Sequence, residues 1–491
     1  HNTMRGVALY GNVEQIRALA NRSDVERISI IEDMAPQNTG SVLDTDTLSV
    51  WAQQHAQNTA STGYTGKGVK IVVLDTGIDY THADLGGPGT KEAYEKAKAS
   101  DTIPEGTYDP KKFLGGYDLV GDDYNSAKKE TSTPHPDANP LDCGGHGSHV
   151  AGTAAGYGVN ADGSTFRGDY SKLTEEQLKD MKIGPGSAPE AQLIGLRIFG
   201  CKGTTAFVPL GLDRVLDPND DGDFSDRADI ANLSLGNEFG VFDETVNYAV
   251  GSLYREGILS VVAAGNANNY NAVGDTYSNS GGPGTSAYSL TVANSIGSTQ
   301  MADRVKILSP ANEADTYGDY SVSFDYSKAT EEQLRGTVVR AATRNRYACE
   351  AFTEEEAAAL KGKWALIDWA EADGTAPCGS RVRFDNLQAA GATGVVIASD
   401  TEVGDTAIGG NSAIPGVRLA KSQVERLSSQ IDSGNLTLQL GENLRESIRV
   451  QNGKLDQANT STARGMHGSH GITKPDVAAP GTNISSILVG G

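Results

Sequence analysis

The segment VKIVVLDTGID, residues 69–79, constrains the fold of this chain more than any other. Its apolar run from Val69 to Leu74 has the length and composition of a fully buried strand. The run delivers Asp75 directly into a Thr-Gly turn. A carboxylate at the end of a buried strand is costly unless another group pairs with it or uses it. Asp75 is therefore either a cap for the following turn or part of a functional site.

Short apolar runs alternate with helical stretches between residues 48 and 299. We expect strands at Val69–Leu74, Gln192–Arg197, Ile230–Leu235 and Leu259–Ala263. We expect helices at His149–Ala155, Pro209–Leu216 and Asp243–Glu256. This alternation predicts a parallel sheet covered by helices on both faces, so the expected fold class is α/β. Catalytic groups belong at the carboxyl ends of such strands, where Asp75 and Asn266 lie.

Two further segments, GGHGSHVAGTAAG at 144–156 and SVVAAGN at 260–266, follow in this order. Together the three segments resemble the subtilisin-like serine proteases, the subtilase family. The resemblance implies a subtilisin-like three-layer fold and a serine endopeptidase with an Asp/His/Ser triad that works through an acyl-enzyme. Asp75 would orient the base, and His146 would be the general base and later the general acid. Asn266 would donate its side-chain amide to the oxyanion.

The resemblance also implies how polypeptide substrates would bind. An extended substrate would pair as a β-strand with one segment and place its reacting residue beside another. The first segment is Ser234, Leu235 and Gly236, and the second is Ala263, Ala264 and Gly265. His149 is interpreted as a packed structural histidine, because no third histidine or carboxylate accompanies it with metal-site spacing.

The segment that should carry the serine nucleophile departs from the family pattern. In the family a Gly-Thr-Ser motif soon follows a segment like KPDVAAPG, but none follows between Pro480 and Gly491. The Gly-Thr-Ser that ends at Ser286 matches a loop before a structural strand, and we interpret it as a decoy. We expect the chain to end just short of the catalytic serine, which would leave this fragment nearly inactive. The alternative is a catalytically inactive subtilase homologue that acts as a protein-binding module.

The order of motifs predicts four segments. Residues 1–40 resemble the C-terminal part of the family's inhibitory prodomain with its linker, or form a plain N-terminal subdomain. Residues 48–299 would be the first part of the catalytic domain, which resumes at 456–491. Residues 300–455 would be a β-rich insertion that resembles a protease-associated domain. The prodomain would be an intramolecular inhibitor, with maturation between Met34 and Thr47.

Composition limits the partners and the compartment. There are 41 basic and 63 acidic residues, and the formal net charge of −22 argues against a nucleic-acid partner. No apolar run approaches the roughly 20 residues of a membrane-spanning helix. A secreted, extracellular protein is expected. The first residues lack a signal-peptide pattern, so we expect the chain to begin inside a larger precursor.

Four cysteines allow three pairings. We favour Cys143–Cys201 and Cys349–Cys378, because each pair falls within one predicted domain. Such disulfides would indicate an oxidising compartment. The alternative is four free buried thiols. The lack of a CxxC pair argues against a zinc site.

The acidic segment DPNDDGDFSD, residues 217–226, resembles the first half of a calcium loop. Oxygen ligands alternate along it, with a glycine at the sixth position. The expected ligands are Asp217, Asn219, Asp221 and Asp223. The twelfth position is Ala228 rather than Glu, so Asp226 or Asp229 would have to complete the coordination of a structural calcium ion. The alternative is a solvated acidic loop.

Overall fold

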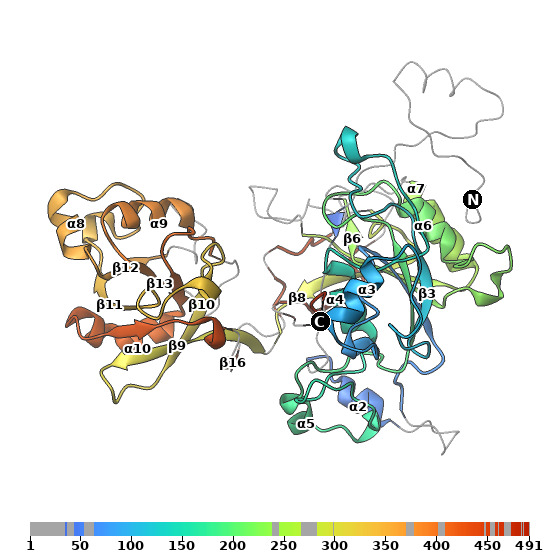
Figure 1. The fold of residues 1–491 in the computed structure, drawn as a ribbon, viewed down its shortest axis with the longest axis horizontal. Helices are drawn as coiled ribbons and strands as arrows, with labels where there is room; N and C mark the ends of the chain where they lie inside the picture. Colours follow the sequence, from blue (N-terminus) through green and yellow to red (C-terminus); the bar gives the residue numbers. More distant parts are fainter. Residues whose placement is uncertain are drawn as a thin grey trace. The chain divides into compact units, whose positions relative to one another are not determined.

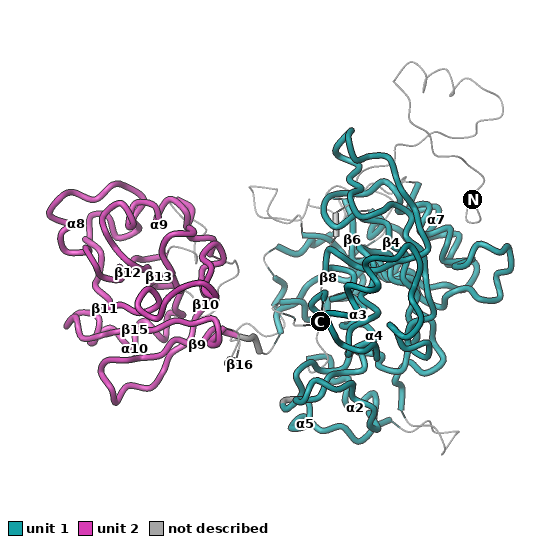
Figure 2. The backbone as a smooth tube through the Cα atoms, viewed as in Figure 1, with its two compact units in different colours: residues 1–297, 456–491 teal, residues 298–455 magenta. Residues whose placement is uncertain are grey.

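The computed structural model describes most of the chain. The described residues are 35–36, 44–53, 63–237, 245–266, 282–297, 299–369, 378–400, 408–445, 448–451, 457–459, 461–465, 473–482, 484 and 486–490. The chain forms two compact units, residues 1–297 with 456–491 and residues 298–455 (Figure 2). The helix and strand expected before residue 32 lie outside the described residues.

A seven-stranded parallel sheet forms the centre of the first unit (Figure 1). Every neighbouring pair in it is parallel. Its strands, in spatial order, are β17 (Val477–Pro480), β8 (Ser289–Ser295), β7 (Leu259–Ala263), β5 (Ile230–Leu233), β2 (Lys70–Asp75), β4 (Gln192–Arg197) and β3 (Phe113–Asp118). Parallel strands share one carboxyl edge, so Asp75 lies among the ends of its neighbours.

Helices cover both faces of this sheet because the side chains of each central strand alternate between two apolar cores. Val72 and Leu74 of β2 pack into the core that contains residues of α6 (Val208–Arg214) and α7 (Thr245–Arg255). Ile71 and Val73 pack into the core on the opposite face. That second core contains residues of α3 (Lys91–Lys98) and α4 (His146–Ala155). The predicted three-layer α/β fold is confirmed.

Two predicted element boundaries near the site are wrong, besides shifts of one or two residues elsewhere, such as α6 in place of the predicted Pro209–Leu216. The run Ile230–Leu235 is not one strand, because β5 ends at Leu233 and a separate strand, β6 (Leu235–Gly236), leaves the sheet. Strand β6 instead pairs with β1 (Ala35–Pro36). The helix expected at His149–Ala155 already begins at His146. Two short helices, α2 (Thr47–Ala52) and α5 (Glu175–Asp180), complete the first unit.

The second unit is built on an eight-stranded sheet that closes through an additional β9–β10 pairing. Its strands, in spatial order, are β10 (Thr316–Tyr320), β14 (Gly416–Leu419), β13 (Gly394–Ala398), β12 (Trp364–Asp368), β11 (Arg335–Arg340), β15 (Thr437–Gln439), β9 (Thr299–Ser309) and β16 (Ile448–Gln451). Its helices are α8 (Glu354–Leu360), α9 (Ser380–Ala389) and α10 (Lys421–Asp432). Its identity as a protease-associated domain stays a prediction.

The cysteines form the two predicted disulfides, Cys143–Cys201 and Cys349–Cys378. The first lies in the first unit and the second in the inserted unit. Both predicted pairings are therefore confirmed. Within the described residues, no helix combines the length and apolar character that crossing a membrane requires.

Candidate active site

Asp75 and His146, which are 71 residues apart in the sequence, meet at the carboxyl edge of the sheet. Asp75 is the last residue of β2 and is fully buried. His146 is the first residue of α4, and its Nδ1 lies 2.7 Å from Oδ1 of Asp75. The carboxylate accepts, so Nδ1 carries the proton and Nε2 is the basic nitrogen of the neutral ring.

Two opposing effects act on the carboxylate of Asp75. Burial raises its pKa, while the charge and hydrogen bond of His146 lower it. The backbone N–H of Thr76 also lowers it, through a 2.7 Å bond to Oδ1. A buried carboxylate held this way fixes the tautomer of the imidazole and stabilises the imidazolium that forms when the ring takes a proton.

The backbone that carries His146 is held by groups that the sequence analysis did not single out. Oδ1 of the buried Asp142 accepts from the N–H groups of Gly144 and Gly145, at 2.8 and 2.9 Å. Its Oδ2 accepts from the N–H and the hydroxyl of Ser148. These bonds fix the first turn of α4, which explains why the helix starts at His146 rather than His149. Asp142 lies three residues before the N-cap residue Gly145, so the usual N-cap pattern does not reveal it in the sequence.

Gly147 allows α4 to approach β2 closely enough for the pair to form. A Cβ atom at this position would lie 2.1 Å from the carbonyl oxygen of Gly77 and 3.0 Å from Cβ of Asp75. Real Cβ atoms do not tolerate the first of these distances. A side chain here would push α4 away from the strand and separate His146 from Asp75.

Asn266 follows the end of β7 and is exposed. Strand β7 pairs with β5, and β5 pairs with β2. Strands β2, β5 and β7 therefore end at the same edge of the sheet, where Asp75 ends β2, Ser234 follows β5 and Asn266 lies three residues after β7. Residues 267–281, which follow Asn266, lie outside the described part of the chain.

The predicted substrate-pairing segment already has a β-partner in this structure. Strand β6 pairs antiparallel with β1, with Ala35 opposite Gly236 and Pro36 opposite Leu235. Ser234 precedes β6, and its hydroxyl accepts from the amide of Asn232 at 3.2 Å. The backbone at 235–236 is thus shaped to pair with an extended chain. Of the pocket residues, Ala263 ends β7, and Ala264 and Gly265 directly follow it, both buried.

Ser286 lies in a buried turn before β8 rather than at an open site. Its N–H donates to the carbonyl of Pro283, and its hydroxyl accepts from the N–H of Tyr288 at 3.2 Å. These contacts fit the interpretation of its Gly-Thr-Ser as a decoy.

The acidic loop at 217–226 is folded around Asp217, which is buried. Oδ1 of Asp217 accepts from the N–H of Asp221 and Oδ2 from that of Gly222, at 3.0 and 2.9 Å. Within the described residues, no three carboxylates of this loop bring oxygen atoms within 4.8 Å of one another. Oδ1 of Asp226 is buried and accepts no hydrogen bond there. Burial and the charges of Asp221 and Asp217 raise the pKa of Asp226.

His149 lies one turn after His146 and holds a different segment. Its Nε2 donates to the carbonyl of Ile484 at 3.0 Å, which is a structural contact. Burial lowers the pKa of His149, and it also lowers the pKa of His82, whose Nδ1 accepts from the N–H of Asp84.

We expect these two histidines to make the protein less stable in mild acid. Because the pKa of each histidine is lower in the folded protein than in the unfolded chain, the unfolded chain binds more protons below about pH 6.5, and stability falls. Gln at 149 can still donate to Ile484, and Asn at 82 can still accept, without titrating. When the pH is lowered from 7.5 to 5.0, the melting temperature of H82N/H149Q should therefore fall by less than the melting temperature of the parent. A variant of the exposed His135 serves as the control, and parallel curves for all three proteins would contradict the prediction.

The parallel α/β sheet and the Asp–His pair at its carboxyl edge define a class of protein, α/β proteins with a carboxylate-oriented histidine, and such a pair can support acid–base catalysis. Within that class, the model of the subtilase family matches residues 66–490. The chain therefore belongs to the subtilase family, as its motifs predict.

Curated proteases and a solved structure are also similar to this chain. The minor extracellular protease Vpr of Bacillus subtilis (strain 168) is 28% identical over 437 residues, 87% of this chain and 42% of Vpr. The PII-type proteinase of Lacticaseibacillus paracasei is 25% identical over 452 residues, 86% of this chain and 21% of the proteinase. In the solved structure of the psychrophilic subtilisin-like protease Apa1 from Pseudoalteromonas sp. AS-11, the aligned part covers 80% of this chain and 79% of the Apa1 chain. The sequence identity is 15% and the TM-score is 0.39. The chain spans less than half the length of these two curated relatives.

Proposed function

We propose that this chain is the catalytic part of a secreted serine endopeptidase that acts through an Asp/His/Ser triad and an acyl-enzyme intermediate. The observation that carries the proposal is the 2.7 Å contact between the buried carboxylate of Asp75 and Nδ1 of His146. Neither the fold of the sheet nor the packing of α4 requires a buried carboxylate and an imidazole at this point. The arrangement is the base-orienting half of a catalytic triad.

In the proposed reaction, the serine Oγ attacks the carbonyl carbon of the scissile peptide while its proton passes to Nε2 of His146. Asp75 stabilises the resulting imidazolium. The side-chain amide of Asn266 donates to the oxyanion of the tetrahedral intermediate. His146 then gives the proton to the leaving amine, which leaves an acyl-enzyme. Water hydrolyses that ester after His146 accepts one of its protons.

Polypeptide substrates are proposed to bind by adding a strand to β6, next to the pocket residues at 263–265. The antiparallel pairing of β1 with β6 supports this mode, because residues 35 and 36 of the chain itself occupy such a strand position. It also supports the proposal that the N-terminal region is an intramolecular inhibitor. Main-chain pairing provides affinity, and the pockets provide specificity.

The proposed compartment is extracellular. The insertion predicted at residues 300–455 is proposed to be a protease-associated domain that gates or extends substrate access. The two disulfides support an oxidising compartment. The curated relative Vpr carries the word extracellular in its name.

An activated serine can be detected directly with a fluorophosphonate probe on the full-length natural protein. We expect one serine other than Ser286 to be labelled, and we expect H146A to abolish the labelling. A protein that takes up no probe yet binds an unfolded polypeptide equally well with and without His146 would instead be an inactive homologue that binds proteins.

We further propose that the acidic loop binds a structural calcium ion. The residues proposed as ligands are Asp217, Asn219, Asp221, Asp223 and Asp226. Asp226 supports this proposal. Its buried Oδ1 accepts no hydrogen bond within the described residues, and the negative charges of Asp221 and Asp217 disfavour its ionised form and raise its pKa. A bound cation would relieve both costs, and calcium prefers oxygen ligands of this kind.

We expect calcium to stabilise the parent by about 2.7 kcal/mol at a concentration of 100 times its Kd. Asp217 is a poor probe, because its carboxylate also holds the loop backbone. D226N keeps the shape of the side chain and should lose most of the stabilisation in calcium while melting with the parent in chelator. D123N, an exposed carboxylate outside the loop, is the matched control. If D226N and the parent gain equal melting temperature from calcium, the ion does not bind here.

A further inference from the structure

Arg197 is the last residue of β4, between the strands that end at two buried carboxylates. In the register of the sheet it lies opposite Asp75 of β2 on one side and opposite Asp118 of β3 on the other. The next residue, Ile198, donates its N–H to the carbonyl of Asp75 at 2.9 Å. The backbone of Arg197 is therefore tied to the residue that orients His146.

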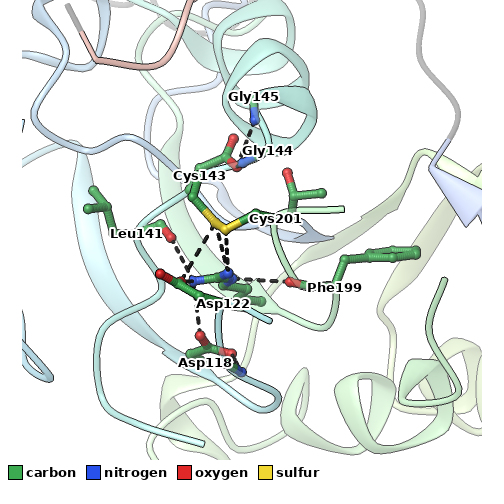
Figure 3. Close-up of a disulfide and its surroundings, with 12 residues drawn as sticks. Asp118, Asp122, Leu141, Cys143, Gly144, Gly145, Phe199 and Cys201 are labelled. Atoms are coloured by element: carbon green, nitrogen blue, oxygen red, sulfur yellow. Dashed lines mark hydrogen bonds and ion pairs between the residues drawn. A yellow bond between two sulfur atoms is a disulfide. The ribbon is translucent and has the colours of Figure 1, made fainter. Parts of the chain in front are cut away.

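The side chain of Arg197 points in the other direction, into the loop that leads to His146, and is 3% exposed. Nη1 donates to the carbonyl of Leu141 at 3.2 Å, and Nη2 contacts Sγ of Cys143 at 3.0 Å. Nε donates to the carbonyl of Phe199 at 3.1 Å. Figure 3 shows these partners gathered around the disulfide.

Two carboxylates neutralise the buried guanidinium. Nη1 lies 3.1 Å from Oδ2 of Asp118 and 2.7 Å from Oδ1 of Asp122. The other oxygen of Asp118 accepts from the N–H groups of Val120 and Gly121. The guanidinium is thus held on several sides, so it can act as a rigid fork rather than as a mobile surface charge.

A disulfide bond links the same loop to the chain after β4, in addition to these contacts. The Cys143–Cys201 disulfide joins the loop before His146 to the chain that leaves β4. Leu141 and Cys143 precede His146 by five and three residues. Displacement of this loop would move the start of α4, and with it the imidazole that must stay 2.7 Å from Asp75.

We propose that Arg197 is a positioning residue for His146, because it fastens the loop at 141–143 to the strand that faces Asp75. The proposal rests on the proposed role of His146 as the base, and it adds a residue that the triad itself does not include. Arg197 touches neither reacting atom. It maintains the distance between the imidazole of His146 and the carboxylate of Asp75 by holding the loop at 141–143. The Cys143–Cys201 disulfide holds the same loop.

The contact between His146 and Asp75 has two spectroscopic readouts that need neither substrate nor nucleophile. One is the midpoint of the ring titration of His146, and the other is the downfield signal of the proton on Nδ1. An ionised carboxylate in contact with the ring favours its protonated form, so a longer distance lowers the midpoint. Both can be followed by NMR on the full chain labelled with 15N-histidine.

We expect R197M to lower the midpoint of His146 by about one unit and to weaken the Nδ1 signal. R197K keeps the charge but cannot contact Leu141, Cys143 and Phe199 at once, so it should show part of the same shift. C143S/C201S should show a smaller shift, because the guanidinium still holds the loop. All spectra are recorded below the melting transition of each variant.

Arg383 provides a matched control in the other unit. It is also a fully buried arginine beside a disulfide, and it donates to the carbonyl oxygens of Asp368 and Cys378. R383M should lower stability without moving the signals of His146. An unchanged midpoint and Nδ1 signal in R197M would overturn the proposal, and if R197M does not fold, the same result in R197K would overturn it. Failure to find a serine nucleophile would affect the proposed function alone, since neither readout involves it.

Discussion

Replacement of His146 by Ala in the full-length natural protein should lower peptide-bond turnover by about a million-fold. The estimate comes from a subtilisin in which loss of the triad histidine alone costs about 2 × 10⁶ in kcat. The reason lies in the geometry, because Nδ1 is occupied by Asp75 and only Nε2 can take the proton of a nucleophile. The measurement is kcat on a chromogenic peptide, with active-site titration to correct for the amount of folded enzyme.

His135 supplies the matched control, because it is exposed and contacts none of the proposed catalytic groups. H135A should retain the parent kcat within about twofold, as is usual for surface substitutions. If H146A keeps more than a tenth of the parent turnover, another group is the base and the proposed mechanism is wrong. Equal KM values in parent and variant would place the loss in the chemical step.

Replacement of Asp75 by Asn should lower kcat by about 10⁴-fold, because the amide no longer fixes the tautomer or stabilises the imidazolium. The side chain keeps its size, and it still reaches the ring at the end of β2. Folding should therefore survive, and near-ultraviolet circular dichroism can verify this. The loss should be smaller than that of H146A, since the orienting group does not itself carry the proton.

Asp84 is the matched control for that variant, since it is equally buried but faces Gly158 rather than His146. Burial raises the pKa of Asp84 to about 7, so the neutral side chain in D84N resembles a protonated form that the fold already accommodates near neutral pH. We expect D84N to keep near-parent kcat. A D75N enzyme with activity within tenfold of D84N would mean that Asp75 does not orient the base.

The sequence was most informative where a motif combined a strand, a turn and a polar residue. Asp75 follows a run from Val69 to Leu74 in which only Lys70 is polar, and its strand, its burial and its place at the carboxyl edge could all be predicted. The closeness of Asp75 and His146 could be predicted only through the family resemblance, because a separation of 71 residues carries no local signal. Asn266 was likewise placed at a strand end, and its role stays a prediction.

The supporting residues of the site could not be predicted, and the reason is physical. Arg197 lies in an apolar run and looks like a strand-end cation, since its partners come from three separate segments. Asp142 caps a helix from four residues away, across two glycines. The break at Ser234 was also missed, because a strand that changes partners keeps the same apolar pattern. Long-range pairing, rather than local preference, decides each of these features.

The order of strands in the central sheet has a consequence for synthesis. Strand β17 completes the sheet by pairing with β8, yet about 180 residues, including the whole inserted unit, separate Ser295 from Val477. At 5–20 residues per second, a ribosome needs roughly 10–40 s to make that stretch. Throughout this interval the outer edge of β8 presents unpaired backbone groups, which other chains can join. During this interval the nascent protein can therefore aggregate through the exposed edge of β8. Slow elongation would lengthen the interval and lower the yield of folded protein, and a chaperone that covers this edge would raise that yield.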